Sequence, residues 1–286
     1  MSFSIDHGDA MNQATKRFAI ITFVFAVNAA CAKQSPSGTE EPVALDPSLE
    51  DYSVEVIRSL PHDTQAFTQG FIVVEGVFYE STGLYGESNI RKVDNSTGNA
   101  IKQNDLDSQY FGEGLTYLEG KFYQLTWKSK QGFVYQETES GFLLLTEDFT
   151  YDSEGWGLTT DGVSLILSDG TETLYFIDPT TKAVTKTLTV AKDGALVSRL
   201  NELEYIEGLI YANVWLTNSI LAIDPKTGSV LREITIPTEE LLGDLEESLG
   251  SDDVLNGIAF DVEQSKIYIT GKRWPLVFEI QFKKIQ

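Results

Sequence analysis

Short runs of alternating apolar and polar residues fill most of the chain after residue 50, and five of these runs share one pattern. Each shared pattern begins with a variable residue that is usually followed by glycine. The five first residues are Gln69, Glu113, Trp156, Asn201 and Asn256, and by subtraction their starts lie 44, 43, 45 and 55 residues apart. Because alternation with a period of two puts every second side chain on one face, the runs predict short, half-buried strands.

Turn signals follow these strands at matching places in the repeats. Four of the five runs reach an acidic residue followed by glycine, which accepts the positive φ that a tight hairpin requires. These pairs are Glu75-Gly76, Glu119-Gly120, Asp161-Gly162 and Glu207-Gly208. A second turn recurs as DNSTG at Asp94, DPTT at Asp178 and DPKTG at Asp224. Each repeat therefore predicts about four short strands, the size of a propeller blade, and the five repeats predict an all-β, five-bladed β-propeller.

The two ends of the repeat region complement each other. The last repeat has three strand signals, GIAF, KIYITG and LVFEIQF, whereas the alternating run Ser53 to Leu60 precedes the first repeat without a partner. Pairing this N-terminal strand with the last blade would close the ring and remove an exposed sheet edge. The insertion Pro237 to Asp253 carries leucines at three-to-four spacing and predicts a short amphipathic helix on the rim. This helix is either a solvated insertion or a lid over the mouth.

The first 32 residues are typical of a signal peptide. Lys16 and Arg17 precede the apolar run Phe18 to Val27, and small residues surround Cys31. The apolar run is too short to span a bilayer comfortably as a permanent helix. Met11 can equally be the true start. Residues 33–51 are polar, with Pro and Ser, and predict a flexible linker, which leaves residues 52–286 for the propeller.

Cys31, the only cysteine of the chain, has two interpretations. The stretch NAAC resembles a bacterial lipobox, in which the cysteine is lipidated, although Asn28 stands where that motif usually has an aliphatic residue. The alternative is cleavage after Ala32, at an A-x-A site. Both interpretations predict an exported protein, periplasmic or extracellular, whose membrane contact would run only through a lipid at Cys31.

The formal net charge of -22 limits the partners. Nucleic acid and anionic membrane surfaces would repel such a chain, so we expect neutral or cationic partners, unless the acidity serves only solubility. We expect a monomer.

Equivalent positions in the inner strands of a propeller converge on one axis. The first residues of the five repeats supply one carboxylate, three amides and one indole, which suits a pocket that recognises an amide and moves a proton. We expect Gly112 and Gly114, which flank Glu113, to bring the backbone close to the axis without filling the mouth. The four tryptophans, which either pack between blades or wall this pocket, are Trp127, Trp156, Trp215 and Trp274.

Other chemistries lack the residues they need. His7 and His62 are the only histidines, too few for a histidine metal cluster or for a Ser-His-Asp arrangement with a choice of partners. The motif PHD at residues 61–63 predicts a turn before the first blade rather than a catalytic dyad. The chain has no glycine-rich phosphate loop. A sugar-cleaving propeller would need paired carboxylates, and Glu113 is the only acid in the converging ring.

Eight sequence blocks occur in one order between about Tyr52 and Phe282. They are PHDTQAFTQG, ESTGLYG, YFGEGLT, GWGLTTDG, RLNELEYI, ANVW, DVLNGIAFD and TGKRWP. With these blocks the chain resembles the glutaminyl cyclases of plant and bacterial type, also called glutaminyl-peptide cyclotransferases, which are five-bladed propellers. The resemblance implies conversion of the N-terminal glutamine of peptides and proteins into pyroglutamate, with loss of ammonia.

The same resemblance implies roles for individual residues. Glu113 would be the general acid and base, and Lys272 would act beside it. The implied substrate-binding residues are Phe67, Gln69, Phe111, Trp127, Trp156, Asn201 and Trp215. No cofactor is implied for catalysis, and the axial channel is a candidate for a structural divalent cation held by backbone carbonyls.

Physical chemistry adds expectations for these residues. A glutamate with an ordinary pKa of about 4.3 is too acidic to be a good base at neutral pH, and we expect aromatic walls to raise the pKa of Glu113. Gln69 and Asn201 could bind the substrate's γ-amide or α-amine. Lys272 either meets the oxygen that becomes negative during attack or forms a salt bridge to an acid between blades. The rival hypothesis is a non-catalytic propeller that binds a peptide N-terminus or another small ligand in the same pocket.

Overall fold

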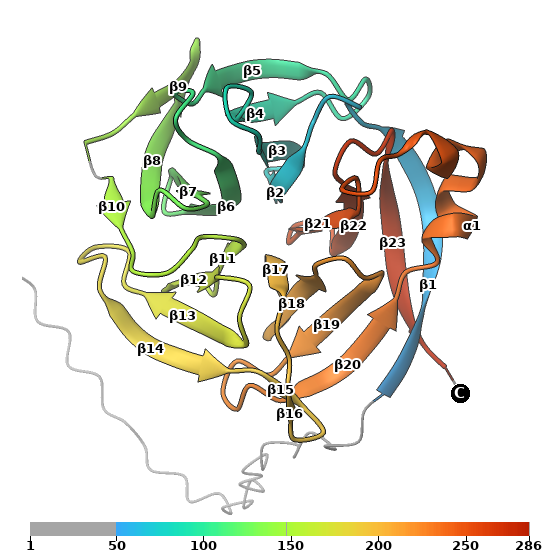
Figure 1. Ribbon diagram of the computed structural model, residues 1–286. Helices are drawn as coiled ribbons and strands as arrows, with labels where there is room; N and C mark the ends of the chain where they lie inside the picture. Colours follow the sequence, from blue (N-terminus) through green and yellow to red (C-terminus); the bar gives the residue numbers. More distant parts are fainter. Residues whose placement is uncertain (1–49, 147, 286) are drawn as a thin grey trace, which may run out of the picture. The chain divides into compact units, whose positions relative to one another are not determined.

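The computed structural model describes residues 50–146 and 148–285. The predicted signal peptide, Cys31 and nearly all of the predicted linker lie outside these residues, so the domain boundaries stay predictions. The described chain is almost entirely β (Figure 1) and begins with strand β1 (Glu50–Pro61). Within the described residues, no helix is long and apolar enough to cross a membrane.

The strands after β1 fall into groups that follow the sequence repeats. The first group is β2 (Thr68–Val74), β3 (Val77–Thr82), β4 (Asn89–Val93) and β5 (Ala100–Asp105). The second is β6 (Gly112–Leu118), β7 (Lys121–Thr126), β8 (Gln131–Thr138) and β9 (Gly141–Leu144), and β10 (Phe149–Thr150) also pairs with β8. The third is β11 (Leu158–Thr160), β12 (Leu165–Ser168), β13 (Thr173–Ile177) and β14 (Val184–Thr189).

A small hairpin, β15 (Ala191–Lys192) and β16 (Ala195–Leu196), leads into the fourth group. That group is β17 (Leu200–Ile206), β18 (Leu209–Val214), β19 (Ser219–Ile223) and β20 (Val230–Thr235). The fifth is β21 (Leu255–Asp261), β22 (Lys266–Gly271) and β23 (Leu276–Lys284). Successive strands within the groups pair antiparallel, so the predicted all-β class and its antiparallel sheets are confirmed.

Strand β1 joins the two ends of the described chain. It pairs antiparallel with β23 from Tyr52↔Lys284 to Pro61↔Leu276, with an irregularity between Val56 and Arg58. This is the predicted pairing of the N-terminal strand with the three-stranded last repeat. The first residues of β1 also pair in parallel with β20, starting at Glu50↔Arg232, so the fourth and fifth groups form one eight-stranded sheet.

The innermost strands pack against one another around a common centre (Figure 1). Each of β2, β6, β11 and β17 contacts the next inner strand in chain order, and β21 contacts β2. Glycines permit this approach, because a Cβ on Gly114 would lie 2.4 Å from the backbone nitrogen of Leu158 and one on Gly112 would lie 2.6 Å from the backbone oxygen of Thr82. This corrects the expectation that the two glycines serve to keep the mouth clear. The two glycines instead allow the backbone of neighbouring strands to come close.

The fourth repeat carries Glu202 where the other repeats have glycine. Its buried carboxylate accepts backbone N–H groups from Phe71 in β2, at 3.3 Å, and from Ile258 in β21, at 2.8 Å. Burial raises the pKa of Glu202, and the nearby charge of Glu204 raises it further. One side chain thus links three inner strands across the centre.

Hairpin turns follow the predicted acid-glycine pairs. Glu75, Glu119 and Glu207 have φ values of 51°, 51° and 49°, and the glycine after each is also positive, as a type I′ turn requires. Asp161 differs, because only Gly162 is positive there. Its carboxylate instead accepts the backbone N–H groups that follow, at residues 163 and 164.

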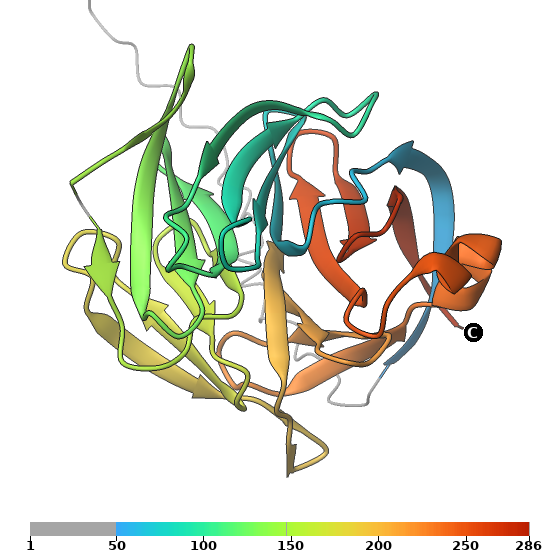
Figure 2. The same cartoon turned by 45° about the horizontal axis from the view of Figure 1, so that its top comes forward.

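The insertion before the last group forms one short helix, α1 (Thr238–Leu242), and a 3-10 turn, η1 (Gly243–Ser248). Leu242 is buried, and Leu241 and Leu249 pack against the same apolar cluster, whereas Leu245 is 43% exposed. The predicted amphipathic helix is present but short, and it lies at the periphery of the strands (Figure 1, Figure 2). The chain beyond η1 returns toward the centre.

The predicted turn before the first strand group is present, since the N–H of Ala66 donates to the backbone oxygen of Asp63 at 2.9 Å. His62, the single histidine of the described residues, forms a buried ion pair beside this turn. His62 Nε2 lies 3.0 Å from Oε1 of Glu80, and Nδ1 lies 2.6 Å from the backbone oxygen of Trp274. Burial opposes the charged imidazole, but the Glu80 carboxylate outweighs it and raises the pKa of His62. Thr68 donates its hydroxyl to the same Glu80 oxygen. The cluster connects the first and fifth strand groups.

His62→Ala is expected to lower the free energy of unfolding by about 3–5 kcal/mol, because it leaves the Glu80 carboxylate buried without its nearest counter-charge. Urea denaturation followed by tryptophan fluorescence measures this loss. The control is Lys283→Ala, which removes an exposed pair with Glu55 and should cost less than about 1 kcal/mol. Equal losses in the two variants would contradict a stabilising role for the buried pair.

Candidate active site

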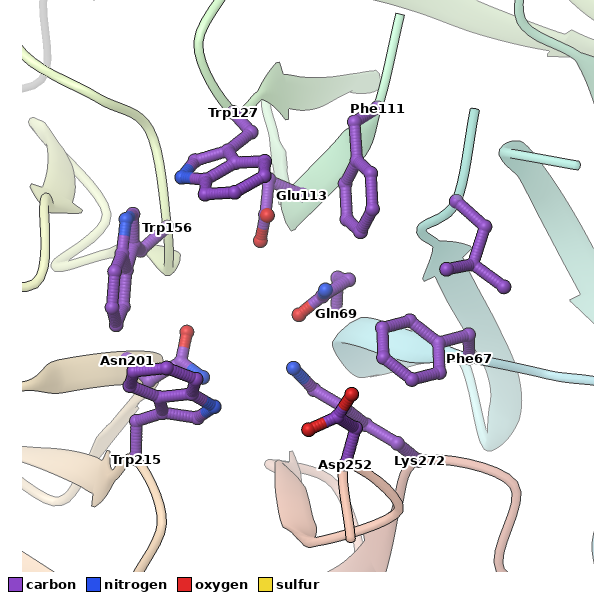
Figure 3. Close-up of a pocket in the computed structure, with 11 residues that line it drawn as sticks. Phe67, Gln69, Phe111, Glu113, Trp127, Trp156, Asn201, Trp215, Asp252 and Lys272 are labelled. Atoms are coloured by element: carbon purple, nitrogen blue, oxygen red, sulfur yellow. The ribbon is translucent and has the colours of Figure 1, made fainter. Parts of the chain in front are cut away.

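The central pocket, with a volume of about 260 Å³, collects the predicted site residues (Figure 3). Its lining comprises Phe67, Gln69, Leu84, Phe111, Glu113, Trp127, Trp156, Asn201, Trp215, Asp252 and Lys272. Every residue that the sequence assigned to catalysis or substrate binding is among them. The structure thus brings together side chains that are up to 205 residues apart, from Phe67 to Lys272.

Several of these side chains come from equivalent places in the repeats. Gln69 lies in β2, Glu113 in β6 and Asn201 in β17, and Trp156 lies two residues before the start of β11. These are inner-strand positions, so the convergence that the repeat pattern predicts is found for all four. Asn256 in β21 differs, because it is fully buried and its side-chain amide donates to the backbone oxygen of Thr68 instead of lining the pocket.

Another set of pocket-lining residues directly follows the second strand of three groups. Trp127 directly follows β7, Trp215 follows β18 and Lys272 follows β22. Since β6 and β7 pair antiparallel, the start of β6 and the end of β7 lie at the same edge of the sheet. The backbone N–H of Trp127 accordingly donates to the backbone oxygen of Phe111 at 3.0 Å. The mouth of the pocket therefore lies at this edge of the groups.

Trp274 does not line the pocket, so of the two roles that the sequence left open for the tryptophans it takes the packing role. Its ring is 2% exposed, packs edge-to-face on Phe278 and donates its indole N–H to the backbone oxygen of Asp253 at 2.9 Å. Packing inside the last group explains this residue. The aromatic wall has three tryptophans.

Glu113 is buried at the base of the pocket, with its carboxylate directed between the aromatic rings (Figure 3). Burial raises its pKa well above the ordinary value, the charge of Lys272 lowers it, and the charge of Glu154 raises it. No hydrogen-bond donor among the described residues contacts this carboxylate. The expected direction of the pKa change is confirmed, and the carboxylate oxygens face the cavity.

Lys272 extends its Nζ into the same cavity (Figure 3). The pKa of Lys272 is lowered by burial, and the charges of Glu113, Asp252 and Asp253 oppose this change without reversing it. The ammonium lies 4.9 Å from the centre of the Phe67 ring, and no described carboxylate lies within ion-pair distance of it. The salt bridge to an inter-blade acid, which the sequence left open, is therefore not formed among the described residues.

Aromatic rings line the pocket in two edge-to-face sets. Phe111 contacts Phe67 with ring centres 6.3 Å apart and Trp127 with ring centres 5.5 Å apart. Trp156 contacts Trp215 at 5.4 Å. This wall is apolar and its rings pack against one another, which suits a site that holds a small flexible group in one bent conformation.

Two amides face the aromatic wall. Gln69 is 3% exposed, and its Oε1 accepts no hydrogen bond from any described residue. A buried acceptor without a partner costs free energy, so it favours a ligand that brings a donor such as an amine or amide N–H. Asn201, also buried, presents its side chain opposite, between Trp156 and Trp215 (Figure 3).

Sequence reasoning missed three residues at this site. Leu84 lines the pocket with a φ of 81°, which a non-glycine residue adopts only under constraint. Asp252 is a second carboxylate in the lining, beside Lys272 (Figure 3), and Glu154 lies behind the wall and acts on Glu113 electrostatically. None of them stands at a repeat position, so the repeat pattern carried no signal for them.

Comparison with known proteins gives consistent matches. The model of a family described as glutamine cyclotransferase matches residues 24–282. A protein from Arabidopsis thaliana named glutaminyl-peptide cyclotransferase is 41% identical over 243 residues, which is 84% of this chain and 75% of that protein. The crystal structure of Myxococcus xanthus glutaminyl cyclase has a TM-score of 0.77 and 32% sequence identity, and the match covers 84% of this chain and 100% of that one.

Proposed function

The chain belongs to the glutamine cyclotransferase family, and we propose that Glu113 moves the protons in the reaction of this enzyme, a glutaminyl-peptide cyclotransferase. The reaction joins the α-amine of an N-terminal glutamine to its own γ-carbonyl carbon and releases ammonia. The observation that carries the role of Glu113 is its burial in the pocket, with a raised pKa and no donor from the described residues on its carboxylate.

One carboxylate can serve both halves of the reaction. The substrate's α-amine, with a reference pKa near 8, loses a proton to Glu113 as its nitrogen attacks the γ-carbon. The protonated Glu113 then donates that proton to the departing amide nitrogen, the bond between this nitrogen and the γ-carbon breaks, and ammonia leaves. A raised pKa brings the carboxyl closer to the pKa of the amine, so the proton moves in either direction at a lower cost.

The other lining residues would bind and orient the substrate. Lys272 is placed to stabilise the negative charge that develops on the γ-carbonyl oxygen. The free acceptor of Gln69 and the amide of Asn201 would hold the substrate's nitrogens. The glutamine side chain must fold back on its own amine, and the aromatic wall would hold this bent form, so that positioning supplies part of the rate.

Ammonia release from a peptide that begins with glutamine tests this function. The wild-type chain should release ammonia stoichiometrically with pyroglutamate, and a peptide that begins with asparagine should release little, because its shorter side chain cannot form the same five-membered ring. The rival hypothesis, a non-catalytic binding propeller, predicts binding without ammonia. Asp252 does not revive the sugar-cleaving hypothesis, because the family is that of the glutamine cyclotransferases.

We also infer that the strand groups form one closed five-bladed propeller. Support comes from the contacts of β2, β6, β11, β17 and β21 in cyclic order and from the pairing of β1 with β23. Closure would hold the pocket residues, which come from all five groups, at fixed distances from one another.

Catalysis is proposed to need no metal. Glu113 can transfer the protons and Lys272 can stabilise the oxyanion, and the described residues hold no group of three or more His, Cys, Asp or Glu side chains that could bind a metal ion. Dialysis against a chelator should therefore leave the rate of ammonia release unchanged. A loss of activity that zinc restores, with thermal stability unchanged throughout, would contradict this. The structural cation in the axial channel stays a separate proposal, since backbone carbonyls would hold it.

The substrates are peptides or proteins with N-terminal glutamine. We further propose that the chain is exported, acts as a monomer, and contacts a membrane only where Cys31 is lipidated. These proposals rest on the N-terminal sequence and the charge of -22. Mass spectrometry of the mature N-terminus distinguishes lipidation at Cys31 from cleavage after Ala32.

A further inference from the structure

One carboxylate outside the pocket lining holds two of its tryptophans. Oε2 of Glu154 accepts the indole N–H of Trp127 at 2.6 Å and that of Trp156 at 3.0 Å. Glu154 itself is half-buried. The mechanism proposed above makes no use of this residue, so its two contacts call for an explanation.

Glu154 closes a gap in the aromatic wall. Ring contacts connect Phe111 to Trp127 on one side and Trp156 to Trp215 on the other. No ring contact between described residues connects Trp127 to Trp156. These two indoles come from the second and third strand groups, and the carboxylate between them is the connection. A hydrogen bond to a charged acceptor is stronger than one between neutral groups, and here it favours one rotamer of each ring.

The backbone around Glu154 fixes where its carboxylate lies. The N–H of Gly155 donates to the backbone oxygen of Trp127 at 3.0 Å, and the N–H of Trp156 donates to that of Ser168 at 2.9 Å. A Cβ on Gly155 would lie 2.4 Å from the Tyr151 hydroxyl oxygen, so only glycine permits this close packing. Before Glu154, the N–H of Tyr151 donates to the backbone oxygen of Lys130 at 3.2 Å, so the segment between β10 and β11 is anchored on both sides of Glu154.

The charge of Glu154 also acts on Glu113. Among the described charged groups, Lys272 opposes burial and lowers the pKa of Glu113, and Glu154 raises it. Tyr151, which is neutral at physiological pH because burial raises its pKa, also faces Glu113. Asp252 acts on the Lys272 side of the pocket. Two fixed charges of opposite sign thus flank the proposed acid and base, and Glu154 is the negative one.

We propose that Glu154 is a positioning residue for cyclisation, which holds Trp127 and Trp156 in the substrate-enclosing wall and balances the charge of Lys272 at Glu113. This proposal rests on the function proposed for Glu113. It assigns Glu154 no contact with the substrate.

Two substitutions separate the parts of this role. Glu154→Gln keeps an acceptor oxygen for the indoles and removes the charge, so the acid-side limb of kcat/KM should move to lower pH with KM nearly unchanged. Glu154→Ala removes both, so the same limb should move and KM should rise roughly 10-fold, as expected for losing about 1.5 kcal/mol of positioning. The α-amine of the substrate titrates identically in all assays, so any difference between profiles comes from the enzyme.

A matched control lies in the same segment. Asp152→Asn removes an exposed negative charge two residues away that contacts neither indole, and its pH profile and KM should match those of the wild type. The indole N–H resonances in a ¹⁵N–¹H spectrum give a readout that needs no activity. Those of Trp127 and Trp156 should shift in Glu154→Ala and stay near their wild-type positions in Asp152→Asn.

A pH profile of Glu154→Gln that superimposes on the wild type, or unchanged indole resonances in Glu154→Ala, would overturn the proposal. A merely structural role would lower the stability of both variants without moving the limb. If Glu113→Gln kept full activity, the function proposed for Glu113 would fail, yet the indole spectrum would still report whether Glu154 holds the rings. The two failures are therefore distinguishable.

Discussion

Glu113→Gln is expected to lower kcat for ammonia release from a glutamine-initiated peptide by about 10²- to 10⁴-fold, the usual contribution of a positioned acid and base. The amide has nearly the same shape as the carboxyl group but can neither take the proton of the α-amine nor return it to the leaving nitrogen. KM should change little, because the aromatic wall and the amides of Gln69 and Asn201 are intact. Steady-state kinetics with coupled ammonia detection measures both constants.

The same hairpin supplies the control for this variant. Glu119 lies in the turn after β6, is exposed and does not line the central pocket. Glu119→Gln therefore removes an equal charge from a position outside the site. Its kcat should equal that of the wild type. Thermal unfolding of Glu113→Gln should show no loss, since the substitution removes a carboxylate that burial disfavours. Full turnover by a folded Glu113→Gln would remove this residue from the mechanism.

The pH dependence of the wild type follows from the raised pKa of Glu113. Activity should fall as the pH drops through that pKa, because the protonated carboxyl can no longer act as base. This acid-side limb should lie well above pH 4.5, the region where an ordinary glutamate titrates. Because the folded pKa is raised, the contribution of this group to stability is full below about pH 4 and is lost as the pH rises through the folded value.

Lys272→Met is expected to lower kcat by about 10²- to 10³-fold, because the oxyanion of the tetrahedral intermediate loses its nearest cationic partner. The variant should also move the acid-side limb to higher pH. The charge of Lys272 lowers the pKa of Glu113, so its removal lets burial and Glu154 raise that pKa further. This shift is opposite in sign to the one expected for Glu154→Gln.

An exposed lysine provides the comparison. Lys226→Met changes the same residue type in the turn that follows β19, and both kcat and the pH profile should match the wild type. Methionine fills most of the volume of the buried lysine stem, so Lys272→Met should fold. A limb that moves to lower pH in Lys272→Met, or does not move, would contradict the assigned direction of this charge.

Much of the strand pattern could be read along the chain. Alternation and the acid-glycine pairs predicted hairpins such as the one at Glu119-Gly120, because side-chain direction in a strand and the φ of a turn residue are local properties. The repeat placed Glu113 beside Gln69 and Asn201, since equivalent inner-strand positions must converge. Phe67, Phe111 and Lys272 came from family resemblance alone.

Other features depend on which segments become neighbours. Trp274 lies in a repeat segment like the pocket tryptophans, but Lys272 takes the position directly after the second strand that Trp127 and Trp215 take in their groups. The Trp274 ring instead fills the space beside Phe278 in the last group. The backbone beside Gly114 belongs to β11, more than forty residues onward, so the reason for that glycine could not be seen from its own strand. Glu154 falls in an irregular segment without periodicity.

The strands and turns of this protein are thus determined by short stretches of sequence, because the pleat and the turns involve residues within a few positions of one another. The chemical environment of Glu113 is not determined locally, because side chains from separate strand groups bury its carboxylate and supply the charges near it. Lys272 and Glu154 act on it from 159 and 41 residues away. These residues come close to Glu113 only when the strand groups pack around one centre, and the pKa of the Glu113 carboxyl follows from that packing.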